Sequence, residues 1–162
     1  MKKIIIHWTA GNYYPTDFDK KFYHYLVDKD GKIHTGKFKP ENNLKCIKNN
    51  YAAHTGGGNT GAIGVSMCGM HGFENRNEVG KYPITPKQLE ATFKLCAELC
   101  KKYKINITPE TVMTHYEFGL KNPFTTSAGK IDIIYLPPYP WVTSKDIGCF
   151  IRAKIKWYKG RI

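Results

Sequence analysis

The sequence is short of acidic residues. Thirteen Asp and Glu residues stand against 25 Lys and Arg residues, which gives a net charge of +12 and a pI near 9.5. A field of that sign attracts polyanions, namely nucleic acid, anionic membranes, or walls that carry phosphate and carboxylate groups. The lysines are scattered rather than gathered in one block, so the charge selects a class of partner and nothing finer.

Long apolar runs are absent as well. The N-terminal MKKIII resembles the start of a signal peptide, but its apolar run is too short and meets His7 at once. No other apolar stretch has membrane-spanning length. We therefore expect a chain that is synthesised in the cytoplasm without a signal peptide.

Two spacings that are typical of metal sites are missing. The five cysteines form no C-x-x-C pair, so the sequence indicates neither a zinc finger nor a disulfide framework. The six histidines include no H-x-x-x-H pair, so no helix presents two ligands on one face. Any metal site must gather its ligands from distant parts of the chain.

The residues that are present indicate a single α/β domain. A chain of 162 residues that is 41% hydrophobic fits one domain with one core. Thr85, Pro86 and Gln88 predict a capped helix that reaches Tyr103, and the C-terminal pattern predicts a basic amphipathic helix at about 144–159. β-Branched and apolar runs predict strands at residues 3–7, 22–28, 32–35, 62–68 and 111–115. Together these elements predict a central mixed β-sheet flanked by helices.

Two histidines lie where functional sites are commonly built. His7 and His115 each end a predicted strand, and strand ends at one edge of an α/β sheet gather functional side chains. Lys130 and Asp132 are two residues apart, so they point the same way in an extended segment. Two imidazoles and one carboxylate would make a catalytic zinc site with an open position for water. The residues alone favour the alternative, in which both histidines are core residues bonded to the backbone.

Several segments, taken in order, resemble the type-2 N-acetylmuramoyl-L-alanine amidase family, which includes phage lysins and peptidoglycan recognition proteins. Each segment is weakly specific by itself, whereas their common order over about residues 2–136 is specific. The segments are IIIHWTAG, FYHYLVDKDGKIHTG, AAHTGGGNTGAIGVSMCG, TPKQLEATFKLCAELCKKY, VMTHYEFG and GKID.

The resemblance implies a role for individual residues. His7, His115 and Asp132 match the three zinc ligands of the family. Lys130 matches a catalytic lysine, and Tyr23 matches a tyrosine that faces the metal. His54 matches a histidine that lines the substrate groove. Trp8, directly after the first ligand, is interpreted as packing that orients the ligand strand, with contact to sugar as the alternative.

The implied activity is zinc-dependent hydrolysis of the amide bond between N-acetylmuramic acid and L-alanine in bacterial peptidoglycan. The setting it implies is a phage or prophage endolysin that acts on the cell wall after release. The alternatives are a peptidoglycan-binding protein without activity on the same fold, and a cytoplasmic amidase that recycles muropeptides. We expect a monomer whose basic C-terminal helix contacts an anionic wall or membrane. Nucleic acid is not expected as a partner, because the basic and aromatic residues form no recognised motif.

Two features depart from the family pattern. Only fifteen residues separate His7 from Tyr23, so the helix that many relatives place there is expected to be short or missing. His115 and Asp132 are also further apart than in the shortest relatives. The inserted residues 122–126 are expected to form a loop beside the metal.

Overall fold

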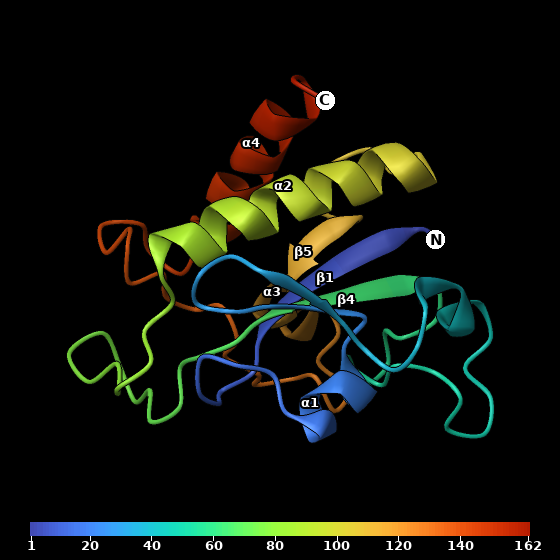
Figure 1. Ribbon diagram of the computed structural model, residues 1–162, viewed down its shortest axis with the longest axis horizontal. Coiled ribbons are helices and arrows are strands. Elements are labelled where there is room, and N and C mark those ends of the chain that lie inside the picture. Colours follow the sequence, from blue (N-terminus) through green and yellow to red (C-terminus); the bar gives the residue numbers. More distant parts are fainter.

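Figure 1 shows a computed structural model of residues 1–162, which is built around one five-stranded sheet. The strands are β1 (Lys3–Trp8), β2 (Tyr25–Val27), β3 (Ile33–Thr35), β4 (Ala62–Met67) and β5 (Val112–Thr114). Their order in the sheet is β3-β2-β4-β1-β5. All neighbours pair in parallel except β2 and β3, which form an antiparallel hairpin. The predicted α/β class with a mixed sheet is confirmed.

Helices cover both faces of this sheet. Two long helices, α2 (Pro86–Tyr103) and α4 (Ile147–Lys159), lie together on one face (Figure 1). The other face carries the short helices α1 (Asp17–Phe22) and α3 (His115–Lys121). A 3-10 helix, η1 (Pro40–Leu44), precedes β4. No helix is both long and apolar enough to cross a membrane.

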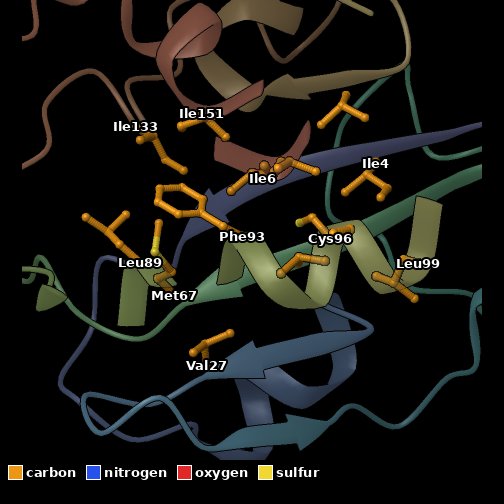
Figure 2. Packing of buried hydrophobic residues seen from close by; sticks show 14 of the residues in the cluster. Ile4, Ile6, Val27, Met67, Leu89, Phe93, Cys96, Leu99, Ile133 and Ile151 are labelled. Carbon is orange, nitrogen blue, oxygen red and sulfur yellow. The ribbon is translucent and has the colours of Figure 1, made fainter. Parts of the chain in front are cut away.

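Alternation along β1 divides its side chains between these two faces. Ile4, Ile6 and Trp8 belong to the main core cluster, which β1 shares with α2 and α4. Figure 2 shows Phe93 pointing from α2 toward Ile6 within this cluster. The intervening Ile5 packs in a separate small cluster with residues that include Phe118 of α3. By the same alternation, His7 faces the side of the sheet on which α1 and α3 lie.

The structure differs from the predicted elements mainly in the short segments. The strand predicted at 22–28 starts only at Tyr25, because α1 runs through Phe22. The strand predicted at 111–115 ends at Thr114, which caps α3, a helix that the sequence pattern did not reveal. The C-terminal helix starts at Ile147 rather than near residue 144. The helix between His7 and Tyr23 is short, as predicted, with six residues.

Candidate metal and substrate site

Three potential metal ligands from distant parts of the chain converge on one point. His7 lies near the end of β1, His115 is the first residue of α3, and Asp132 lies in the loop that follows α3. The two Nδ1 atoms are 3.1 Å apart, and Oδ2 of Asp132 lies 2.9 Å from Nδ1 of His7 and 3.1 Å from Nδ1 of His115. Ligands at zinc bond lengths in a tetrahedral arrangement lie about 3.3 Å from one another. The triangle therefore has the size that a zinc ion requires.

Local structure fixes the direction of the second and third ligands. The Thr114 side chain accepts a hydrogen bond from the Glu117 amide, and the Glu117 side chain accepts one from the Thr114 amide. This capping box starts α3 at His115. Beyond Asp132, Ile133 has a φ of 62°, which is rare for a β-branched residue. That turn places the Asp132 carboxylate at the site and buries the Ile133 side chain in the core.

The distal nitrogen of His115 is held by a relay to a glycine-rich loop. Its Nε2–H donates to Oγ of Ser127 at 2.9 Å, and that hydroxyl donates to the carbonyl of Gly56 at 2.7 Å. With the proton on Nε2, Nδ1 presents its lone pair to the ligand triangle. This is the outer contact that orients a metal-binding imidazole. Ser127 could not be predicted from the sequence, because no local pattern links residues 56, 115 and 127.

His54 holds the distal nitrogen of His7 in a similar way. Nε2 of His54 donates to the Ala62 carbonyl at 3.2 Å, which leaves its Nδ1 as an acceptor. Nδ1 lies 2.7 Å from Oγ1 of Thr55 and 3.2 Å from Nε2 of His7. The ring of His54 is therefore engaged at both nitrogens, and the residue also lines the cleft beside the ligands.

Glycines bring the loop of His54 against the loop that carries Ser127. A Cβ atom on Gly56 would lie 1.8 Å from Oγ1 of Thr126, and one on Gly58 would lie 2.5 Å from the ring of Phe118. These glycines therefore allow a close approach of two loops.

Burial and close contacts shift the pKa values of the ligands His7 and Asp132 and of the neighbouring His54. Burial lowers the pKa of His7 and, more strongly, that of His54, so both rings are neutral. Burial alone would raise the pKa of Asp132, but the contacts of its carboxylate with the imidazoles of His115 and His7 outweigh burial and hold that pKa well below its usual range. Neutral imidazole and ionised carboxylate are the forms that bind a metal ion.

A cleft of about 590 Å³ is lined by two of the three potential ligands, His115 and Asp132. Phe18 and Phe22 of α1 line it, as do Thr126 and Lys130 from the segment between α3 and Asp132. The predicted loop at 122–126 thus reaches the cleft through Thr126. The two phenylalanines were not predicted, because nothing in the sequence pattern of a short exposed helix marks it as the wall of a cleft.

Tyr23 lies against the first ligand within this cleft, with its ring centroid 5.2 Å from that of His7. Burial and the nearby charge of Asp132 raise the pKa of Tyr23 far above its usual value, so the hydroxyl stays protonated and can donate. Lys130 is exposed at the edge of the cleft. Trp8 lines the cleft, but only 5% of its surface is exposed. Its ring packs against that of Phe73.

The remaining histidines, His24, His34 and His71, do not line the cleft. His24 is buried, with Nε2 donating to Oδ1 of Asn43 at 2.8 Å and Nδ1 accepting from the Gly64 amide at 2.9 Å. His34 pairs with Asp28 in the β2–β3 hairpin. Of the predicted site residues, the structure brings together His7, Tyr23, His54, His115, Lys130 and Asp132.

Comparison with known proteins agrees with this geometry. A family model described as N-acetylmuramoyl-L-alanine amidase matches residues 1–130. The amidase LysC from Clostridium intestinale URNW has 20% sequence identity and a TM-score of 0.59, over 96% of this chain and 85% of that chain. The E90A mutant of PlyL has 19% identity and a TM-score of 0.53, over 96% and 84%. These two structures show the same fold, and no curated protein matches the sequence. The chain belongs to the N-acetylmuramoyl-L-alanine amidase family.

Proposed function

We propose that this protein hydrolyses the amide bond between N-acetylmuramic acid and L-alanine in peptidoglycan, with zinc as its cofactor. The observation that carries the proposal is the triangle of His7, His115 and Asp132, of which His115 and Asp132 line an open cleft. Three protein ligands leave a fourth position for water or substrate, which distinguishes a catalytic zinc site from a structural one. When bound there, zinc lowers the pKa of a water molecule and polarises the scissile carbonyl.

In the proposed reaction, Lys130 and Tyr23 stabilise the negative charge that develops on the substrate. Negative charge develops on the carbonyl oxygen during attack, and the Lys130 ammonium at the edge of the cleft is placed to stabilise it. Tyr23 keeps its proton, so its hydroxyl orients water or donates a hydrogen bond to the same oxygen.

His54 is assigned to orientation in this proposal. Its Nε2 proton is committed to the Ala62 carbonyl, and its pKa lies well below the usual value. A ring that stays neutral and buried is a poor proton donor to the departing nitrogen of L-alanine. Its contact with His7 instead keeps the first ligand in place.

The biological setting that we propose is a phage or prophage endolysin, synthesised in the cytoplasm and active on the wall after release. The net charge of +12 favours contact with an anionic wall, and the lysines of α4 are part of that charge. The alternative functions are a peptidoglycan-binding protein without activity and a cytoplasmic amidase that recycles muropeptides.

Two substitutions separate the metal from the chemistry. Asp132→Ala removes a ligand, so we expect zinc content and cleavage of a purified muropeptide to fall together. Lys130→Met leaves the three ligands intact, so zinc content should stay at the wild-type level while the cleavage rate falls about 100-fold or more, the loss typical when one stabilising donor is removed. Wild-type rates in Lys130→Met would remove this residue from the mechanism. Zinc bound by wild type without any cleavage would favour the binding protein.

A further inference from the structure

Arg152 on α4 reaches the junction of β5 and α3 at which the ligand His115 sits. Its Nη1 donates to Oε1 and Oε2 of Glu117 at 3.0 and 3.1 Å, and to the carbonyl of Val112 at 3.0 Å. Val112 starts β5 and Glu117 lies in the first turn of α3. One guanidinium therefore holds the chain on both sides of His115.

Glu117 links Arg152 to Thr114, the residue directly before the ligand His115. Oε1 of Glu117, which Arg152 contacts, also accepts the backbone amide of Thr114 at 3.1 Å. The Thr114 side chain in turn accepts the Glu117 amide and so defines where α3 starts. A shift of Glu117 would move the first turn of α3, and the His115 imidazole would move with it.

The surface of α4 is shaped for this contact. Gly148 lies one turn before Arg152 on the same face of α4, and a Cβ atom there would lie 2.2 Å from Oε2 of Glu117. Only glycine allows the helix to approach the carboxylate so closely. The side chains of Arg152 and Glu117 are 11% and 19% exposed. Loss of either partner would leave a largely buried charge without its counterion.

We propose that Arg152 is a positioning residue for the metal ligand His115 and acts through Glu117 and the Val112 carbonyl. The proposal rests on the zinc site proposed above. It gives α4 a part in the site, although the helix lies outside residues 1–130, which the family model matches. The simpler alternative is that the ion pair only attaches α4 to the domain. The two differ in whether a folded variant binds zinc as the wild type does.

The test compares Arg152→Met with Lys154→Met in the full chain. Both remove one cation from α4, but Lys154 is partly exposed, forms only a long ion pair with Glu90 at 3.8 Å and lies over the rings of Tyr139 and Phe150, away from His115. Zinc affinity is measured by chelator competition, and ligand geometry by the visible spectrum of the cobalt-substituted protein, at a temperature where circular dichroism shows both variants folded. We expect Arg152→Met to raise the zinc Kd about 10-fold and change the cobalt spectrum. Lys154→Met should match the wild type.

Glu117→Gln provides the second arm. It should weaken zinc binding to a similar extent, and the double variant should lose little more than either single one, because both act through one contact. If Arg152→Met does not fold, Arg152→Lys takes its place with a smaller expected loss. A folded Arg152 variant with wild-type zinc affinity and cobalt spectrum, and only a lower Tm, overturns the proposal. Wild-type protein that binds no zinc overturns the proposed function itself.

Discussion

Burial shifts the pKa of His24, a residue that does not line the cleft, and this shift makes the stability of the fold depend on pH. Burial lowers its pKa from 6.5 to about 4, against a smaller opposing effect of its hydrogen bond to Asn43. Because the folded-state pKa is depressed, the unfolded chain binds more protons between these two values. The contribution of His24 to stability is complete above pH 6.5 and is lost as the pH falls toward 4.

We therefore expect the free energy of unfolding of the metal-free protein to decrease between pH 6.5 and 4, by up to about 1.4 kcal/mol per pH unit from His24 alone. His7 and His54 have lowered pKa values and add to the same trend. Urea denaturation at several pH values measures the slope. His24→Gln should make it shallower, and an unchanged slope in that variant would contradict the assignment.

Individual site residues were predictable only where a neighbour in sequence or a family motif marked them. His7 and His115 end strands, and Lys130 and Asp132 share a short motif, so pattern and resemblance together indicated them. Ser127 was not predictable, because its role comes from contacts with Gly56 and His115 that exist only in the folded chain. The same holds for the double hydrogen bonding of His54, a residue that lines the cleft and also contacts His7.

At the scale of elements, the glycine-rich loop supports the site through close packing. Gly58 is buried against the ring of Phe118, which lies on α3 together with His115. A Cβ atom there would meet the ring at 2.5 Å, so Gly58→Ala must displace the loop or α3. We expect a loss of about 1–3 kcal/mol in the free energy of unfolding, as for other overpacked sites.

Gly160→Ala is the matched control, since its new Cβ would lie 3.7 Å from the nearest backbone atoms and meet only ordinary contacts. It should change stability by less than about 0.5 kcal/mol. Thermal or denaturant unfolding of both variants measures the difference. Equal stabilities would show that the loop accommodates a side chain and that the close approach is not required.

Elements with strong local signals were predicted well, and short ones were not. The capping box of Thr85 and Gln88 starts α2 where expected, and the β-branched run of β1 forms a buried strand. By contrast, α3 has only seven residues and follows directly on β5. A segment of that length takes its structure from tertiary contacts, here the Thr114 cap and the Arg152–Glu117 pair, which periodicity does not reveal.

At the scale of the whole molecule, the proposed attraction of this basic protein to an anionic wall predicts that its lytic activity depends on its net charge. Lys154, Lys156 and Lys159 lie on α4, which covers the face of the sheet opposite α1 (Figure 1). Residues of α1 line the cleft, and none of the three lysines does. Replacing all three by Gln should lower lysis of whole cells by weakening attraction to the anionic wall. The deficit should be larger at low salt, where charges are less screened.

Cleavage of a small soluble muropeptide by that triple variant should stay near the wild-type rate, because none of the three lysines lines the cleft. Exposed lysines near the η1 segment, Lys37, Lys39 and Lys45, provide a control with the same change in net charge. Equal lysis by wild type and the α4 variant at low salt would show that these lysines do not help to bind the wall.

The fold as a whole followed from the sequence more fully than the architecture of the site did. Strand and helix patterns predicted an α/β domain with a mixed sheet, and the ordered family segments predicted which residues meet. One wall of the cleft is formed by Phe18 and Phe22, which both lie in a helix of only six residues. The hydrogen bonds that orient His115 depend on contact between the loops that carry Gly56 and Ser127. Neither is encoded in local periodicity.

The proposed zinc-dependent amidase activity is tested most directly with purified protein and purified peptidoglycan. New amino-terminal L-alanine and new reducing sugar ends are followed with and without a zinc chelator, and again after zinc is restored. We expect new L-alanine termini without new reducing ends, loss of that activity with the chelator, and recovery when zinc is restored. Absence of L-alanine termini with zinc bound would contradict the amidase, and cleavage that persists without metal would contradict the zinc site of His7, His115 and Asp132.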